Sequence, residues 1–444
     1  MAKTVSDIPC GRLAGENYDG INRYLGIRYA TAGRFEYPQE ITAWEGEYNA
    51  CAYGPAPVQE STYFPADPED PANHYPHEFM RGVECSYSED CLYLNIWTPE
   101  NAVNAPVLVV VYGGGLVSGM SQSNEFSGDE FARRGIITVT FNYRVNVFGF
   151  AYLKELADAE GKAGNYGYYD QQTAIQWVRH NIGALGGDIN NMTIIGQSAG
   201  AASAEAQIKS PLNKGFFRQA IIQSSAGFTT MLKSKDNREA EDKKWREVYE
   251  QSGAGNIEAF KTMPAEDLYR VFKEVSAKHP IAFCNAVYDE NFAGPAKNKP
   301  VDTKVMYSIT SEDVMPAVLY FMGKGLAKSQ SALTDTYAYY FCRQLPGDDK
   351  GAWHSSDLPY VYATLNRSWR PFTPEDYDLS NRMIGYLERF IKTGNPNGGN
   401  SPEWLPVNRS GRYMFFDVNK QGMHRIPLLH LIRETVAGKN LGMQ

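Results

Sequence analysis

Six short apolar runs, separated by helical patterns, place the strongest constraint on how this 444-residue chain folds. They are rich in β-branched residues and almost continuously apolar, as strands are when helices cover both faces of their sheet. The runs are Pro106–Tyr112, Ile136–Tyr143, Met192–Gly196, Gln219–Ser225, Val305–Ser308 and Thr336–Phe341. We therefore expect an α/β protein with a mostly parallel, doubly wound sheet and ligand sites at the carboxyl ends of its strands.

A helical pattern joins the second and third runs. Within Asp170–Leu185, apolar residues recur at the spacing of one helix face, and Gly186–Gly187 supplies a stop. Strand, helix and strand thus follow one another in the order that a parallel sheet requires.

We expect a single domain over residues 1–444, with two additions to the sheet. Residues from about Thr229 to Asn298 are more charged and carry longer helical patterns, which favours a helical insertion or cap over one edge of the sheet. The stretch Glu60–Glu84 contains Pro, Asp and aromatic residues and is expected to form a lid-like loop.

The charge balance argues against a nucleic-acid partner. With 43 basic and 51 acidic residues the net charge is −8, so the surface as a whole repels phosphate backbones.

No apolar run reaches the roughly 18 residues of a membrane span, and the amino-terminal segment lacks the apolar core of a secretory signal. We therefore expect a cytoplasmic protein, and its oligomeric state stays open.

Six cysteines are scattered along the chain without a CxxC pair, which fits reduced thiols rather than a zinc ribbon or a thioredoxin-type site. Cys85 and Cys91 are close enough in sequence to form a disulfide, and that alternative stays open.

His74, His77 and Glu78 could suggest a metal site. However, the metal-binding motif HExxH is absent, and we expect these residues to lie in a lid or surface loop, without the helical spacing that two ligands need. No metal or cofactor is expected.

The sequence GQSAG at Gly196–Gly200 directly follows an apolar run and precedes a helix-compatible segment. A serine on a sharp turn from strand to helix needs small residues two positions to either side, because the tight backbone leaves no room for larger ones. This context favours Ser198 as an exposed nucleophile over an ordinary glycine-rich turn.

Three glycines, Gly113–Gly115, follow the run Pro106–Tyr112. Their backbone N–H groups can converge on a negatively charged oxygen. A phosphate cradle is the alternative, but no Lys-Ser/Thr follows, and Ser118 stands where a dinucleotide fingerprint needs its third glycine. An oxyanion hole is the better interpretation.

A serine nucleophile also needs a base and a carboxylate that orients the base, and in this type of fold the chain order is Ser, acid, His. Four histidines follow Ser198, and only His354 lies on a loop after a late strand; the others are His279, His424 and His430. Glu312 and Asp313 stand side by side after Val305–Ser308, and spacing alone leaves both open as the acid.

Five blocks of the sequence resemble the type-B carboxylesterase family, which includes the cholinesterases and the bacterial para-nitrobenzyl esterases. They occur in the family's order and extend over most of the chain. The blocks are YLGIRYA (Tyr24–Ala30), SEDCLYLNIW (Ser88–Trp97), VVVYGGGLVSG (Val109–Gly119), NYRVNVFGF (Asn142–Phe150) and Gly164–Gly200. The resemblance implies the α/β-hydrolase fold and hydrolysis of small to medium alkyl or aryl esters through an acyl-enzyme.

The resemblance also implies site residues. It makes Ser198 the nucleophile and His354 the base, and it places Asp313 at the acid position, with Glu312 where the family usually has an aspartate. The oxyanion-hole N–H groups would come from Gly114, Gly115 and Ala199.

Several positions depart from the family pattern. Gln197 replaces the usual Glu before the serine, and Leu116 replaces an aromatic residue after the three glycines, which should reshape the acyl side of the pocket. Val314 and Ser355 replace glycines beside the acid and the base, which puts the choice between acids in question.

Two further departures concern the surroundings of the site. The family's cysteine shortly before Gln59 is absent, so Cys91 lacks its usual disulfide partner, which implies a reduced, intracellular version of the fold. The stretch between Asp313 and His354 is shorter than in typical members, so we expect less helical cover and a more open site.

Two other functions use the same fold. An amidase or thioesterase needs the same triad with better protonation of the leaving group. A non-catalytic binding member of the family typically lacks the nucleophile, whereas Ser198, Asp313 and His354 all occur here in order.

Overall fold

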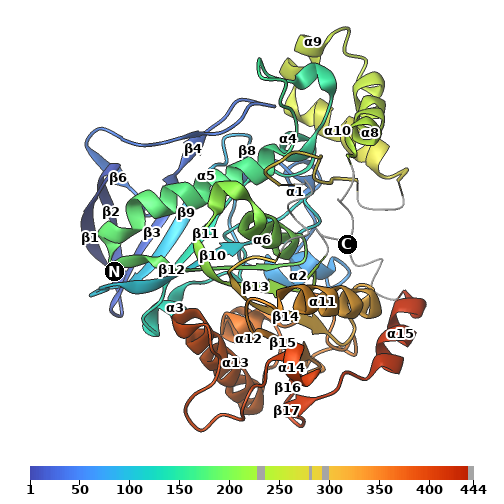
Figure 1. The fold of residues 1–444 in the computed structure, drawn as a ribbon. Coiled ribbons are helices and arrows are strands. Elements are labelled where there is room, and N and C mark those ends of the chain that lie inside the picture. Colours follow the sequence, from blue (N-terminus) through green and yellow to red (C-terminus); the bar gives the residue numbers. More distant parts are fainter. Residues whose placement is uncertain (228–235, 280–282, 293–299, 439–444) are drawn as a thin grey trace.

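A long, mostly parallel sheet runs through the molecule in a computed structural model, which describes residues 1–227, 236–279, 283–292 and 300–438 (Figure 1). Its strands lie in the order β1-β2-β3-β9-β11-β10-β12-β13-β14-β15-β16-β17, with β6 beside β2. Their bounds are β1 Ala2–Ile8, β2 Gly11–Tyr18, β3 Ile21–Arg28, β6 Glu47–Asn49, β9 Tyr93–Pro99, β10 Ala105–Val111, β11 Ile137–Phe141, β12 Gly187–Gln197, β13 Phe217–Gln223, β14 Lys304–Thr310, β15 Thr336–Phe341, β16 Tyr413–Phe416 and β17 Gly422–His424. Two small sheets pair β4 (Ala30–Thr31) with β5 (Gln39–Glu40) and β7 (Ala56–Pro57) with β8 (Tyr87–Ser88).

The centre of the sheet, from β11 to β16, is parallel, and antiparallel strands flank it on both sides. All six apolar runs are strands of this parallel part, which confirms the predicted fold class. The pattern missed β1, β2, β3 and β9, the antiparallel strands of the amino-terminal edge. Residues of β1 alternate between exposed and partly buried positions, so they lack the continuous apolar signal of the central strands.

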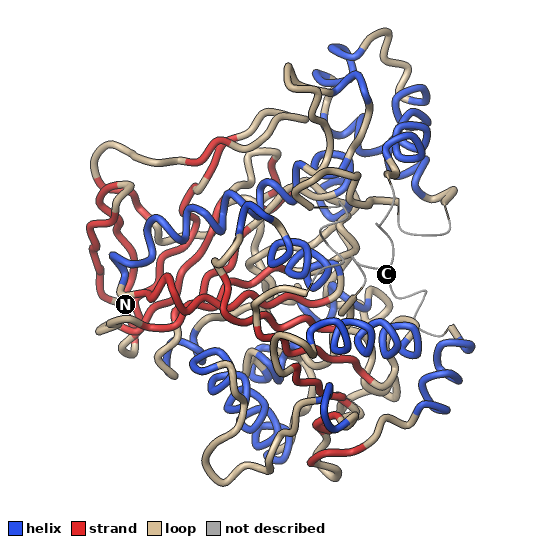
Figure 2. The backbone as a smooth tube through the Cα atoms, viewed as in Figure 1, coloured by secondary structure: helices blue, strands red, loops and turns tan. Residues whose placement is uncertain are grey.

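Helices cover both faces of the sheet, with α5, α6 and α11 on one side and α3 and α13 on the other (Figures 1 and 2). The helices are α1 Glu60–Tyr63, α2 His74–Phe79, α3 Asp129–Arg133, α4 Asn146–Phe150, α5 Tyr166–Asn181, α6 Ala199–Lys209, α8 Arg238–Gln251, α9 Ile257–Thr262, α10 Ala265–Ser276, α11 Pro316–Gln330, α12 Leu358–Val361, α13 Pro374–Thr393, α14 Val407–Ser410 and α15 Leu428–Ala437. Short 3₁₀ turns occupy Lys154–Leu156, Ile182–Leu185, Pro211–Asn213 and Leu365–Arg367.

The two-sided cover explains the composition of the central strands. In β10, Val107, Leu108 and Val109 are fully buried, although successive side chains point to opposite faces of the sheet. The predicted helix Asp170–Leu185 is present as α5 and the following 3₁₀ turn, which ends at the left-handed Gly186.

Both predicted additions contain helices. Helices α8, α9 and α10 lie within the predicted insertion, at one end of the molecule (Figure 1), while its residues 229–235, 280–282 and 293–298 lie outside the described part. The expectation of a loop at Glu60–Glu84 was wrong in part, because α1 and α2 interrupt it. His74 and His77 therefore share one helix, contrary to the loop without helical spacing that we expected.

Two observations concern membranes and thiols. None of the helices in the described residues combines the length and apolarity that a bilayer crossing needs. All six cysteines are free, so Cys85 and Cys91 do not form the disulfide that their spacing left open.

Candidate functional site

Ser198 occupies a sharp turn between β12 and α6, as the motif predicts. Its backbone has φ 56° and ψ −128°, which is strained for a residue with a side chain. A Cβ atom at Gly196 would lie 2.2 Å from the carbonyl oxygen of Gly200, and one at Gly200 would lie 2.2 Å from that of Val111. The two glycines are therefore needed for this turn to form.

His354 and Asp313 come together from loops after β15 and β14. The Nδ1 atom of His354 lies 2.5 Å from Oδ1 of Asp313, whose side chain is fully buried. The carboxylate also accepts hydrogen bonds from the hydroxyl of Ser224 (2.6 Å) and from the backbone N–H groups of Thr310 and Val314. These donors hold the carboxylate so that one oxygen faces the imidazole.

The neighbouring Glu312 faces other groups. Its Oε2 accepts from the backbone N–H of Ala352 at 2.7 Å and from the hydroxyl of Ser311, and its Oε1 lies 3.2 Å from Nε2 of His430. Asp313 is thus the carboxylate in contact with His354, whereas Glu312 accepts a hydrogen bond from the backbone of the loop that leads to His354.

The second nitrogen of the imidazole contacts the residue before the serine. Nε2 of His354 lies 3.1 Å from the amide nitrogen of Gln197, which donates to it when the imidazole carries its proton on Nδ1. Among the described residues no hydrogen bond joins Ser198 Oγ to His354, so the predicted serine–histidine contact is replaced by one to the adjacent side chain. The histidine nonetheless lies at the serine turn, where its Nε2 lone pair accepts from this amide.

The glycine segment Gly113–Gly115 lies beside Ser198 because β10 and β12 are neighbouring parallel strands. A Cβ atom at Gly113 would lie 3.1 Å from Cβ of Ser198. Within the described part of the chain, no protein acceptor takes the N–H groups of Gly114, Gly115 or Ala199. These donors are available to an oxygen bound next to the serine.

Gln59 and Asn146 fix the loop that carries the glycines. The Gln59 side chain accepts from the N–H of Gly119 (2.9 Å) and donates to its carbonyl (3.1 Å). The Asn146 backbone N–H donates to the carbonyl of Leu116 at 2.7 Å.

Sequence reasoning missed Ser224, Gln59 and Asp357 as parts of the site. Ser224 follows β13, so the rule that sites lie at the carboxyl ends of strands could have indicated it. Nothing in the sequence pattern indicates that Gln59 contacts a glycine loop 60 residues away. The other candidate histidines lie elsewhere: His279 contacts Glu247, and His424 contacts the backbone of Gln421.

Asp357 is a third carboxyl group behind the triad candidates. It accepts hydrogen bonds from the hydroxyl of Tyr339 (2.8 Å) and the amide of Gln223 (3.2 Å). Burial, together with the negative charge of Asp313, raises the pKa of Asp357 from 3.8 to about 6.

The raised pKa predicts a pH-dependent stability difference. Because the folded pKa is above the unfolded one, Asp357 stabilises the folded state at low pH and this contribution is lost as pH rises from about 4 to 6. Asp357→Asn removes the titration. We expect the free energy of unfolding of the variant, relative to the wild type, to rise by about 1 kcal/mol between pH 5 and pH 7.5 in urea denaturation. An equal difference at both pH values would contradict the assignment.

The described residues contain no group of three or more His, Cys, Asp or Glu side chains placed to hold a metal ion. The earlier metal candidates have other partners. His74 accepts from Lys350, His77 contacts the carbonyl of Pro68, and Glu78 pairs with Arg370.

Comparisons with known proteins identify relatives of the chain. The model of the carboxylesterase family matches residues 2–324 and 323–430. The para-nitrobenzyl esterase of Bacillus subtilis is 34% identical over 456 aligned residues, covering 87% of this chain and 89% of that protein. The bile salt-activated lipase of Mus musculus is 29% identical, covering 90% of this chain and 80% of that protein. The structure of carboxylesterase EST55 from Geobacillus stearothermophilus superposes with a TM-score of 0.79 at 27% identity, covering 97% of this chain and 99% of that one.

Proposed function

The chain belongs to the carboxylesterase family, and from this membership we propose that Ser198, His354 and Asp313 form the catalytic triad with which it hydrolyses carboxylic esters. The observation that carries the assignment is the contact of His354 Nδ1 with a buried carboxylate, while its Nε2 faces the serine turn. This is the arrangement that a general base requires.

The proposed reaction has two acyl-transfer steps. Ser198 Oγ attacks the ester carbonyl and its proton passes to Nε2 of His354; the C–O bond to the alcohol then breaks, and the alcohol leaves with that proton. Water repeats the sequence on the acyl-enzyme and releases the acid. Gln197 donates to the same nitrogen, so this hydrogen bond must lengthen when Ser198 transfers its proton.

We assign the oxyanion hole to the N–H groups of Gly114, Gly115 and Ala199. The absence of protein acceptors for these groups in the described residues supports the assignment. Donors fixed in advance stabilise the negative charge that develops on the carbonyl oxygen without reorganising during the reaction.

The contact between Gln59 and Gly119 gives a test of the oxyanion loop. Gln59→Met keeps the length of the side chain but removes both hydrogen bonds to Gly119. Because loss of one oxyanion donor costs on the order of 10²–10³ in turnover, we expect loosening of the loop to lower kcat by about tenfold. Steady-state hydrolysis of a p-nitrophenyl ester measures the effect, and an unchanged kcat in a folded variant would show that this contact does not hold the site.

Small to medium alkyl and aryl esters are the proposed substrates. The relatives include a para-nitrobenzyl esterase, whose name refers to an aryl-alkyl ester, and a bile salt-activated lipase. Hydrolysis rates on a matched aryl ester, thioester and anilide test the reaction class. We expect the ester to be cleaved fastest; faster cleavage of the thioester or anilide would favour the alternative of a thioesterase or amidase.

A further inference from the structure

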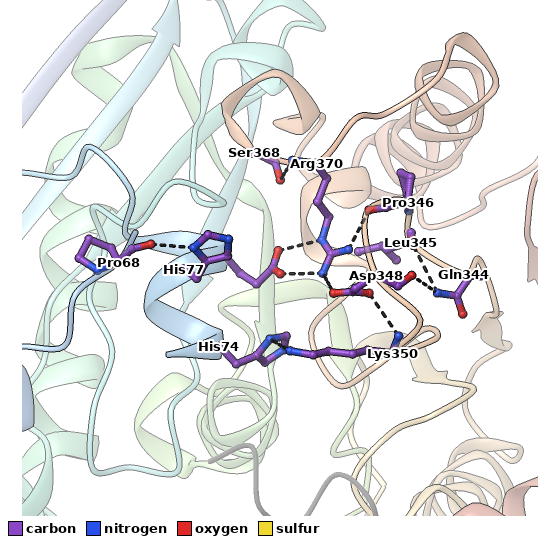
Figure 3. Close-up of polar contacts among 11 residues, drawn as sticks. Pro68, His74, His77, Gln344, Leu345, Pro346, Asp348, Lys350, Ser368 and Arg370 are labelled. Carbon is purple, nitrogen blue, oxygen red and sulfur yellow. Dashed lines mark hydrogen bonds and ion pairs between the residues drawn. The ribbon is translucent and has the colours of Figure 1, made fainter. Parts of the chain in front are cut away.

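Helix α2 lies against the segment that leads to His354. Three elements meet there: α2, the loop 345–354 after β15, and the segment around Arg370 (Figure 3). Lys350 reaches α2 from the loop, and its ammonium group lies 2.9 Å from Nδ1 of His74. Burial, and next the charge of Lys350, lower the pKa of His74 to about 4, so the ring is neutral near pH 7 and accepts this bond.

One guanidinium group joins all three elements. Arg370 forms two hydrogen bonds with Glu78 of α2, at 3.0 and 2.6 Å, and a third with Asp348 of the loop at 2.6 Å. It also donates to the carbonyl of Pro346 at 2.8 Å. The side chains of Arg370 and Glu78 are only 1% and 4% exposed, so these charges depend on each other for compensation.

Aromatic contacts extend this connection to the base itself. The ring of Trp353, the residue before His354, has its centroid 4.5 Å from that of His74 and 5.8 Å from that of Tyr75. Phe79 contacts the same indole at 5.9 Å. The Tyr75 hydroxyl then donates to the backbone carbonyl of His354 at 3.3 Å.

His354 needs such support because its backbone lies outside regular strands and helices, and the next residue, Ser355, has φ 80°. A base that moves by a fraction of an ångström loses its alignment with the nucleophile. We infer that helix α2 is the positioning element of the catalytic base, acting through the Tyr75 hydroxyl, the Trp353 indole and the ion-pair chain Glu78–Arg370–Asp348. The inference rests on the proposed triad and adds to it a specific role for the predicted lid.

Two variants test the Tyr75 hydrogen bond and the ion-pair chain separately. Tyr75→Phe removes one hydroxyl and keeps the ring on Trp353, and Glu78→Gln removes the charge that Arg370 faces. Since a hydrogen bond contributes about 0.5–1.5 kcal/mol, we expect Tyr75→Phe to lower kcat about three- to tenfold. Glu78→Gln should lower it more than tenfold. The KM should stay within about twofold in both, because α2 is proposed to act on the base rather than on substrate binding.

Matched controls come from the same chain. Tyr37→Phe removes a hydroxyl that donates to the carbonyl of Gly164 at 3.1 Å, away from the site. Glu69→Gln removes an ion pair between Glu69, which precedes α2, and Arg81, which follows it, without touching the loop 345–354. Both should retain the wild-type kcat within about twofold.

The readouts are kcat and KM for a p-nitrophenyl ester, the rate of labelling by a fluorophosphonate, and thermal unfolding. Lower kcat and slower labelling in a Tyr75→Phe variant with the wild-type melting temperature support the inference, even where Glu78→Gln does not fold. Unchanged kcat in folded Tyr75→Phe, or a raised KM with unchanged kcat, overturns it. Ser198→Ala, run in parallel, tells the two proposals apart: retained hydrolysis there overturns the triad and this inference together, whereas lost hydrolysis with an unaffected Tyr75→Phe overturns the inference alone.

Discussion

Ser198→Ala is expected to reduce kcat/KM for ester hydrolysis by a factor on the order of 10⁴–10⁶. The variant lacks the atom that would form the acyl-enzyme, while the glycine N–H groups and the histidine stay in place. Hydrolysis of p-nitrophenyl butyrate, followed at substrate concentrations around KM, measures the loss.

Ser203→Ala provides the control for this variant. Ser203 lies one turn further along α6, where its hydroxyl accepts a hydrogen bond from Gln171. The kcat/KM of Ser203→Ala for the same ester should stay within a few-fold of the wild-type value. If Ser198→Ala kept more than about one hundredth of the wild-type activity, Ser198 would not be the nucleophile.

Asp313→Asn is expected to lower kcat by a factor on the order of 10⁴, because an amide at this position favours the wrong tautomer of the histidine and cannot stabilise the imidazolium. Glu312→Gln should lower kcat less than tenfold, since Glu312 contacts the loop backbone rather than His354. The comparison uses kcat for the same p-nitrophenyl ester, with circular dichroism as a check of folding. A larger loss in Glu312→Gln than in Asp313→Asn would reverse the assignment of the acid.

The features that could be predicted are those with a local cause. Buried strands need continuous apolar runs, so six of the seven parallel central strands were predicted from the sequence, and only the four-residue β16 was not. A serine at a tight strand–helix turn needs small residues on both sides, so the turn at Ser198 could be predicted from the motif and the apolar run before it. The ends of parallel strands meet at one edge of the sheet, so the loops after β14 and β15 limited the search for the acid and the base.

The features that were missed depend on contacts between distant segments. The two adjacent acids Glu312 and Asp313 have the same chemistry, and only the direction of each side chain separates them. Helix α2 has six residues and an internal proline, too short and irregular for a periodic signal. Its side chains pack on Trp353 and pair with Arg370, which lies 292 positions from Glu78 in the sequence. The contact between Gln197 and His354 is likewise a tertiary one.

Peptide mapping of the fluorophosphonate-treated protein tests the triad most directly. We expect one adduct, on the peptide that contains Ser198, forming rapidly in the wild type and far more slowly in His354→Ala. An adduct on another residue, or equally fast labelling without the imidazole, would contradict it.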